Sequence, residues 1–124
     1  MKPLETTILT WPLVKEICKG TYQGKTLHRI LMNTALSEFV VSGNVLDIGS
    51  GSTPGSYYDY IKKRKPYSFL FADYYQASKK TIKIYLEKPF SIKKQKFDYI
   101  LCMNTLEHIY HFKNMIQSSF KALK

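Results

Sequence analysis

The chain has 124 residues, the size of one ordinary domain, and its 44% hydrophobic and 15% aromatic content is enough for a packed core and excludes wholesale disorder. No apolar run approaches the ~18 residues of a transmembrane helix, so we expect no membrane span. Two cysteines are too few for a disulfide scaffold, and the first residues do not resemble a secretory leader, so we expect a cytoplasmic protein.

The formal net charge is +10, from 19 basic and 9 acidic residues. Eleven of the basic residues lie between Lys62 and Lys96, where Asp73 and Glu87 are the only acidic residues. A basic face of this kind can meet nucleic acid, an anionic membrane or an acidic partner. A solvated, lysine-rich surface explains the same charge more simply.

The first half of the chain begins with an irregular or helical extension at residues 1–24, which contains a short helix at 13–19. The main domain is expected over residues 25–124. Its first elements are predicted from helical or continuous apolar patterns and from glycine and proline positions. They are a helix at residues 25–40, a turn at 42–44, a buried strand at 45–48, a glycine-rich loop at 49–55 and a second helix at 56–65, which Pro66 ends.

The second half repeats short apolar strands between helical or polar segments. Its expected elements are strands at residues 67–72, 82–86 and 97–102, a short helix or turn at 77–81, a basic connector at 89–96 and a long helix at 105–123. Helices that alternate with short strands predict an α/β domain with a mostly parallel sheet flanked by helices. Strands of such a sheet are buried on both faces, which agrees with their continuous apolar character.

The strongest local signal is the segment Val45-Leu46-Asp47-Ile48-Gly49-Ser50-Gly51. A strand leads directly into a loop where Gly49 and Gly51 carry no side chains, so a ligand can approach the backbone closely. The helix expected next would aim its free N–H groups at the same crevice. Ligands of open α/β sheets bind in this crevice, at the carboxyl ends of the strands, although a tight turn without a ligand has the same pattern.

The second signal is Asp73, which ends the strand at 67–72 and lies 22 residues after Gly51. An acidic residue at about this spacing reaches the neighbouring position in the crevice and accepts hydrogen bonds from ribose hydroxyls. A helix cap or turn is the alternative role for an isolated aspartate. When Asp73 is considered together with the glycine loop, the ribose interpretation is favoured.

The third signal is the segment "FDYILCMNTLEHI" at residues 97–109. With "VLDIGSG" at residues 45–51 and the acidic end of the next strand, it resembles class I S-adenosylmethionine-dependent methyltransferases with a methyltransferase type 11-like domain. The resemblance covers roughly residues 25–124 and implies a Rossmann-like fold, S-adenosylmethionine as cofactor and methyl transfer to an O, N or C nucleophile. A P-loop is disfavoured, because no Lys occurs between Gly49 and Tyr60.

The resemblance also implies which residues contact the cofactor. Asp47 would lie near the methionine amino group, the glycine-loop backbone under the methionyl and ribose parts, Asp73 on the ribose hydroxyls and Tyr74 against adenine. The backbone after the strand at 97–102 would face the methionine end. The predicted cofactor residues are Asp47, Gly49, Ser50, Gly51, Asp73, Tyr74, Glu87, Cys102, Met103 and Asn104.

The sequence departs from the family in three places. Thr53 occupies the position of a third loop glycine, with Gly55 nearby. Tyr85 lies where relatives often carry an aspartate that caps the adenine amino group, and Glu87 is the candidate substitute. The chain also stops before the family's last strands, so the strand at 97–102 would lie at an edge of the sheet. We expect a second copy, a partner or residues 1–24 to cover that edge, or a truncated form of the domain.

No residue is identified as a firm general base. His108 is the weak candidate, because it follows Glu107 near the crevice, and a structural role is favoured for it. No metal site is expected, since His108, His111 and Cys102 lack a metal-ligand spacing. The function predicted is methyl transfer to an unidentified acceptor. The alternatives are a non-catalytic methyltransferase-like binding or scaffold protein and a nucleic-acid-binding module or methyltransferase.

Overall fold

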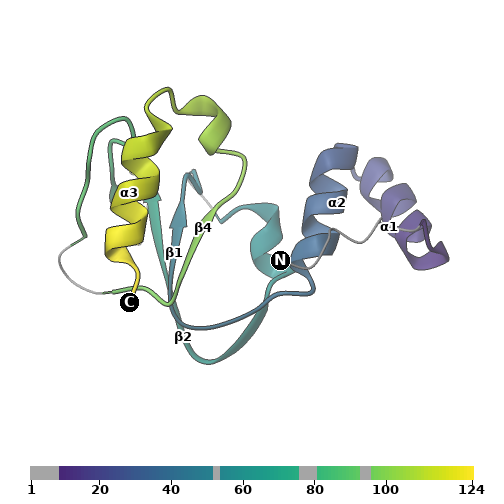
Figure 1. The fold of residues 1–124 in the computed structure, drawn as a ribbon. Helices are drawn as coiled ribbons and strands as arrows, with labels where there is room; N and C mark the ends of the chain where they lie inside the picture. The colour runs from purple at the N-terminus through teal and green to yellow at the C-terminus, as the bar shows by residue number, and fades with distance from the viewer. Residues whose placement is uncertain (1–8, 52–53, 76–80, 93–95) are drawn as a thin grey trace.

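The computed structural model describes residues 9–51, 54–75, 81–92 and 96–124. It has a parallel sheet between helical layers, with a helical pair extending beyond one end (Figure 1). The helices are α1 (Trp11–Tyr22), α2 (Leu27–Leu36) and α3 (Phe112–Ala122), with short 3-10 turns η1 (Ser56–Asp59) and η2 (Leu106–His108). The strands are β1 (Val40–Ile48), β2 (Lys62–Asp73), β3 (Thr81–Lys83) and β4 (Tyr99–Cys102).

The sheet has the strand order β3-β2-β1-β4, and every pairing is parallel. In the register, Asp47 of β1 lies opposite Phe71 of β2 and Leu101 of β4. All four carboxyl ends therefore meet at one end of the sheet. The α/β class and the parallel sheet are as predicted, and so is the edge position of the fourth strand.

Each face of the sheet has its own apolar cluster, because alternate side chains of a strand point to opposite faces. Leu46 and Ile48 of β1 pack with Ala72, Phe97 and Met115 on the face that α3 covers. The other cluster joins residues of α2, the beginning and middle of β1, the turn η1 and the residue before β2, which are Leu36, Val41, Val45, Tyr57 and Ile61. The two clusters enclose β1 from both faces of the sheet, and Leu46 and Ile48 are fully buried.

The helix predicted at residues 56–65 is wrong. Only the four-residue turn η1 forms, and β2 already begins at Lys62, which pairs with Val40. Pro66 therefore ends no helix and lies inside β2, at an irregularity in the β1–β2 register, where a proline without an N–H is tolerated. The buried side chain of Tyr57 anchors the turn on the sheet, so the chain returns to the ladder instead of continuing a helix.

The turn predicted at residues 42–44 is also wrong, because these residues are part of β1. Asn44 exchanges hydrogen bonds with Asp98: its N–H donates to the Asp98 Oδ2 at 2.8 Å, and its carbonyl accepts the Asp98 N–H at 2.8 Å. Ser68 also donates to the Asn44 side chain, at 2.8 Å between the two oxygens. These partners, on β2 and just before β4, hold the segment in the sheet, although Gly43 has a positive φ of 72° at the irregularity in the β1–β2 register.

The long helix predicted at residues 105–123 is split into η2 and α3. Between them the N–H groups of Tyr110 and His111 donate to the Glu87 carboxylate, with N···O distances of 2.8 and 2.7 Å. This carboxylate replaces the helical acceptors for two consecutive residues, so the helix starts again at Phe112.

Other boundaries also differ from the prediction. The helix predicted at residues 25–40 ends at Leu36, and Val40 already belongs to β1. The helix in the N-terminal extension is longer than expected, because the Thr10 side chain caps it and Pro12 lies in its first turn. The third strand ends at Lys83, although Ile84 still donates to the Asp73 carbonyl at 2.9 Å. The short element predicted at residues 77–81 falls almost entirely outside the described residues.

Candidate functional site

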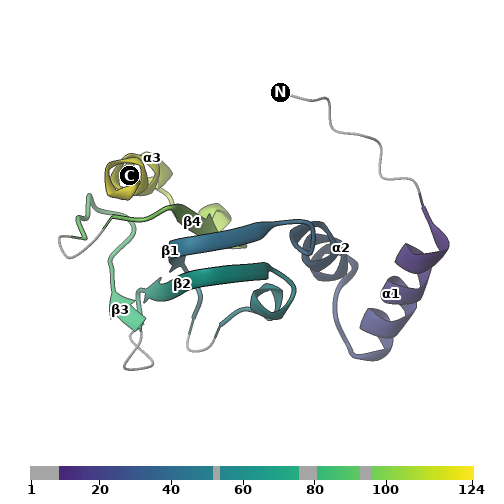
Figure 2. The ribbon, with the colours of Figure 1, turned by 90° about the horizontal axis from the view of Figure 1, so that it is seen from below.

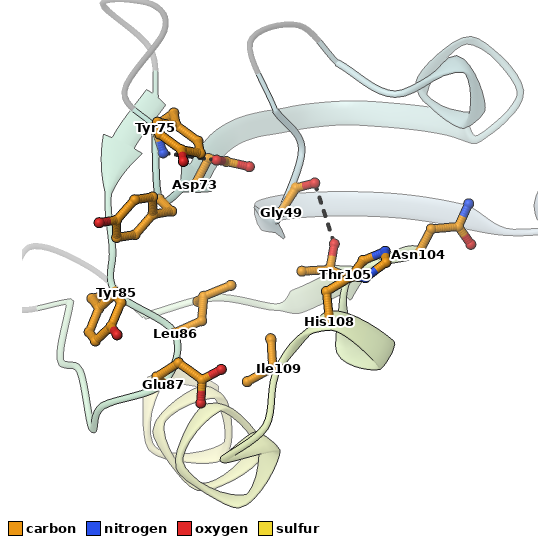
Figure 3. A pocket seen from close by; sticks show the side chains of 11 residues that line it. Gly49, Asp73, Tyr75, Tyr85, Leu86, Glu87, Asn104, Thr105, His108 and Ile109 are labelled. Atoms are coloured by element: carbon orange, nitrogen blue, oxygen red, sulfur yellow. Dashed lines mark hydrogen bonds between the residues drawn. The ribbon is translucent and has the colours of Figure 1, made fainter.

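A pocket of about 640 Å³ lies at the carboxyl ends of the four strands. Its walls come from the segments that follow each strand (Figure 3). This is the position where open α/β sheets bind ligands, and the volume is within the usual range for small-molecule sites. The lining residues are Gly49, Asp73, Tyr74, Tyr75, Tyr85, Leu86, Glu87, Asn104, Thr105, His108 and Ile109.

The Asp73 side chain turns toward the glycine loop. Its Oδ2 accepts the Gly51 N–H at 2.8 Å, and its Oδ1 accepts the Tyr75 N–H at 3.0 Å. An ionised carboxylate has about four acceptor positions, so two remain for a ligand. The two motifs that the sequence placed on neighbouring strands thus meet at the mouth of one pocket.

The two loop glycines serve different purposes, although both have positive φ angles, 77° at Gly49 and 73° at Gly51. A Cβ atom on Gly49 would lie 2.0 Å from the Thr105 Oγ1, so the space beside this residue is filled by the protein itself. A Cβ atom on Gly51 would meet no atom within 4 Å. A side chain would therefore have room at Gly51 and none at Gly49, where Thr105 takes the space, while Gly49 and not Gly51 lines the pocket.

Ser50, between the two glycines, has a buried hydroxyl. Within the described part of the chain, its Oγ has no hydrogen-bond partner. A buried hydroxyl without a partner costs free energy, on the order of 1–3 kcal/mol, unless something else binds it. This oxygen is therefore a candidate contact for a ligand at the loop.

Asp47 is fully buried beneath the loop and does not line the pocket. The Tyr57 hydroxyl lies 2.8 Å from the Asp47 Oδ1 and 2.9 Å from its Oδ2, and it donates a hydrogen bond to this carboxylate. Burial raises the pKa of Asp47 to about 6, and the hydrogen bond from Tyr57 opposes part of that rise. Burial and the Asp47 charge together raise the pKa of Tyr57 well above its ordinary value.

Aromatic rings form the wall of the pocket beside Asp73. Tyr74 and Tyr85 have ring centroids 5.5 Å apart, and Tyr75 packs edge-on against Tyr74. Two ammonium groups lie over this wall, Lys83 at 5.5 Å from the Tyr74 centroid and Lys88 at 5.6 Å from the Tyr85 centroid. The sequence identified Tyr74 as a cofactor residue and Tyr85 only as a departure from the family. The structure brings both to the pocket.

Glu87 lies across the pocket from the glycine loop (Figure 3). The two N–H groups that its carboxylate accepts, from His111 and Tyr110, lower its pKa, so the side chain is ionised at neutral pH. The wall therefore carries two carboxylates, those of Asp73 and Glu87. None of the described residues that line the pocket is a lysine or an arginine.

The three residues predicted after β4 differ in where they lie. Asn104 lines the pocket with a positive φ of 54°, and its side chain points away from the cavity (Figure 3). There its Oδ1 lies 3.1 Å from the His28 Nε2 of α2. Met103 packs with the cluster around Tyr57, and Cys102 is half-buried at the end of β4. The structure thus brings one of the three to the cavity.

His108 lines the pocket from η2, as its position in the sequence suggested. Its N–H donates to the Thr105 carbonyl at 3.0 Å, which shapes the turn around the pocket. The sequence missed Tyr75, Leu86, Thr105 and Ile109 as lining residues. The signal that could have found them is position: Leu86 ends a predicted strand, and Tyr75 and Thr105 each lie three residues after one. Ile109 directly follows the candidate His108.

The basic residues between 62 and 96 do not form one face among the residues described. Lys62 to Lys65 lie at the start of β2, at the end of the sheet away from Gly49. Lys83 and Lys88 lie at the pocket end, and β2 separates the two groups by about 30 Å of strand. The described basic residues named here therefore lie in two separate groups, one at each end of the sheet.

The described residues contain no group of three or more His, Cys, Asp or Glu side chains that fits a metal ion. No helix in the described part of the chain is long and apolar enough to cross a membrane.

Comparison with known proteins points to one family. Its profile, described as a methyltransferase domain, matches residues 21–124, a span that contains every residue lining the pocket. No curated protein and no solved structure matches the chain.

Proposed function

Because the chain belongs to the methyltransferase domain family, we propose that it binds S-adenosylmethionine and transfers the methyl group to an oxygen, nitrogen or carbon nucleophile. The family resemblance inferred from the sequence motifs is thereby confirmed. The observation that carries the proposal is the position of Asp73, whose carboxylate lines the pocket and binds the Gly51 N–H.

The ribose of the cofactor has two neighbouring hydroxyl groups, and the free acceptor positions of Asp73 suit both of them. The two backbone N–H groups that already bind this carboxylate hold it in one orientation. The open space at Gly51 and the unpartnered Ser50 hydroxyl fit a ligand that passes close to the loop. These three features support the glycine loop and Asp73 as the ribose and methionyl contacts.

The charge of the pocket also supports this ligand. S-adenosylmethionine carries a sulfonium and an amino group, which are both cationic, and the described lining has two carboxylates and neither lysine nor arginine, with Lys83 and Lys88 confined to the tyrosine wall. A nucleoside triphosphate would need a positive field at the loop instead. For Asp47 we propose an indirect role, since its buried carboxylate contributes negative charge beneath the loop without reaching the cavity.

For the adenine ring we propose the aromatic wall of Tyr74 and Tyr85. A planar base stacks well on tyrosine, and stacking contributes about 1 kcal/mol per ring pair. Because Tyr85 occupies the position of the family's aspartate, the acceptor for the adenine amino group is proposed to be Glu87, which lines the same wall.

The cofactor supplies an electrophilic methyl group, and the chain supplies alignment. Asn104, Thr105 and His108 line the side of the pocket that follows β4, and we assign the acceptor to this side. When the methyl donor and the methyl acceptor are held in line, the encounter of two molecules becomes an intramolecular step. This alignment supplies most of the rate enhancement in the proposed reaction. His108 is the one imidazole in the described lining and is the candidate to accept a proton.

The test is calorimetric titration with S-adenosylmethionine and S-adenosylhomocysteine. In Asp73→Asn one charged acceptor is lost, and we expect the dissociation constant to rise about 10- to 100-fold, which corresponds to ~1.4–2.8 kcal/mol. Asp59→Asn, at an exposed carboxylate outside the pocket, is the matched control. A folded wild-type chain that binds neither ligand would refute the proposal.

A cofactor analogue that lacks the ribose hydroxyls distinguishes a direct contact between Asp73 and these hydroxyls from an effect of Asp73 on the shape of the loop. If Asp73 binds those hydroxyls, their removal weakens binding to the wild type and has little further effect on Asp73→Asn. Equal losses in both proteins would mean that Asp73 only shapes the loop.

A non-catalytic binding protein with the same fold is the second candidate, because Tyr85 replaces a family aspartate. It predicts cofactor binding that never yields S-adenosylhomocysteine. Incubation with radiolabelled methyl donor and fractionated cell extract distinguishes the two, since an enzyme labels a component of the extract and His108→Ala slows that labelling.

A further inference from the structure

The rim of the pocket after β4 is connected to the helix α2 by a contact between two side chains. The Asn104 Oδ1 lies 3.1 Å from the His28 Nε2, although the two residues are 76 positions apart in the chain. Because an amide oxygen can only accept a hydrogen bond, the His28 ring is the donor. The neutral ring with its proton on Nε2 and the protonated ring both donate from this nitrogen, so either form keeps the contact.

The backbone of Asn104 depends on such a partner. Its φ of 54° lies in the left-handed region, where all the other described residues with positive φ are glycines. This conformation costs free energy for a residue with a Cβ atom, so surrounding contacts must favour it. The contact with His28 also holds the Asn104 side chain away from the cavity (Figure 3), so the backbone of Asn104 lines the pocket.

The two neighbours of Asn104 are held by other parts of the fold. Met103 packs in the apolar cluster that contains Leu36 of α2. The Thr105 hydroxyl lies 3.4 Å from the Gly49 carbonyl oxygen and 3.2 Å from that of Met103. We call residues 103–105 the β4 corner. Since both of its ends are anchored, its remaining freedom is the conformation of Asn104, which the His28 contact restrains.

The helix α2 is attached to the fold without His28. It packs against α1 and the turn η1 (Figures 1 and 2), and it buries Ile30, Asn33 and Leu36. The His28 side chain is exposed, and a hydrogen bond that competes with water contributes little to the free energy of unfolding. The contact with Asn104 is therefore explained by the shape of the pocket and not by the stability of the helix.

We propose that His28 is a positioning residue for the amino-acid part of the cofactor and that it acts through the Asn104 side chain. This inference rests on the proposed function, which fixes the orientation of the ligand. With adenine on the tyrosine wall and the ribose at Asp73, the amino-acid part extends toward the opposite side of the pocket, which the β4 corner lines. The backbone groups that it meets there are directed by the φ angle of Asn104.

Loss of the His28 contact lowers the fraction of molecules in which the β4 corner is ready for the ligand. The apparent dissociation constant rises in inverse proportion to this fraction. The net contribution of one hydrogen bond between neutral groups corresponds to about a 3- to 10-fold change in such an equilibrium. A ligand that does not reach the β4 corner should not be affected.

Calorimetric titration with two ligands is the test. S-adenosylhomocysteine contains the amino-acid part, whereas 5′-methylthioadenosine keeps the nucleoside and lacks that part. His28→Ala should weaken binding of the first ligand about 3- to 10-fold and leave binding of the second unchanged, while Asp73→Asn should weaken both. His28→Gln should bind like the wild type, because its side-chain amide donates from nearly the position of Nε2. Leu31→Ala, at another exposed position of α2, is the matched control and should also bind like the wild type.

The coupling between the two side chains gives a second readout. Asn104→Gly removes the acceptor without opposing the positive φ, so His28→Ala should have no further effect on binding in that background. In the protein without ligand, the nitrogen-15 order parameter of the Asn104 amide should fall in His28→Ala and recover in His28→Gln. Circular dichroism verifies that the variants fold.

The outcomes distinguish this inference from the proposed function. A folded wild type that binds neither ligand refutes the proposed function itself. If the wild type binds S-adenosylhomocysteine, three results would each overturn the role of His28 alone. They are unchanged binding of this ligand by His28→Ala, an order parameter of Asn104 that does not change, and a loss that His28→Gln does not reverse.

Discussion

Substitution of Asp47 by asparagine tests the energetic cost of the buried carboxylate. The Asp47 side chain is fully buried, and its one hydrogen-bond donor is the neutral Tyr57 hydroxyl. No described cation balances its charge. Asparagine has nearly the same shape, keeps an oxygen that accepts the Tyr57 proton, and cannot ionise.

The magnitude follows from the pKa of Asp47, which burial raises from an ordinary 3.8 to about 6. One pKa unit corresponds to ~1.4 kcal/mol, so this carboxyl changes the free energy of unfolding by about 3 kcal/mol. Below pH ~3 the carboxyl is protonated in both states, and its full contribution to stability is present. Between pH ~3 and ~6 the unfolded state loses the proton first, so stability falls as the pH rises. Above pH ~6 the loss is complete.

Urea unfolding followed by circular dichroism at pH 4 and pH 7 measures this effect. Relative to the wild type, Asp47→Asn should be about 2 kcal/mol more stable at pH 7 than at pH 4, because a constant cost of the amide cancels in the difference and part of the loss has already occurred at pH 4. Asp59→Asn, at an exposed carboxylate, is the control and should follow the wild-type profile. Parallel profiles for Asp47→Asn and the wild type would refute the reasoning from burial.

The remaining predictions concern the loop glycines and the thiols. Gly49→Ala should lower the free energy of unfolding by roughly 2–5 kcal/mol, because positive φ and contact with Thr105 both oppose a side chain. Gly51→Ala should cost only ~1–2 kcal/mol, from its φ angle alone, and should weaken cofactor binding. Equal losses of stability in the two variants would contradict the difference in surroundings between Gly49 and Gly51. Burial raises the pKa of Cys102 to about 11, so only about one thiol in a thousand is ionised at pH 8. With a disulfide reagent at pH 8, exposed Cys18 should react quickly, and Cys18→Ser should abolish this fast phase. A fast phase that persists in Cys18→Ser would show that Cys102 is reactive.

The local patterns of the sequence were sufficient for three of the four strands and for their parallel arrangement. Mostly apolar runs at residues 45–48, 67–72 and 97–102 predict strands of a parallel sheet. Burial on both faces holds for residues 45–48 of β1, where Asp47 is the polar exception, whereas β4 at the edge is only partly buried. The glycine loop and Asp73 were predicted at one crevice for a topological reason. Parallel strands that neighbour each other end on the same side of a sheet.

The sequence could not predict where partners from distant segments would interrupt a pattern. Residues 56–65 and 105–123 have helical spacing, yet Tyr57 is held by Asp47 and the second segment is interrupted by Glu87. Each interruption depends on a hydrogen bond between residues at least ten positions apart in the chain. Local propensity contains no information about such partners.

The same distinction holds at the site. The residue types and their order determined the fold class, the family and the end of the sheet where the pocket lies, since these follow from local patterning and strand direction. Only the tertiary structure decided that Thr105 fills the space beside Gly49, that Asp47 is buried against Tyr57, and that three tyrosines form one wall. Those outcomes depend on side-chain packing across the sheet, and such packing exists only when the strands and the helices on both faces are in place.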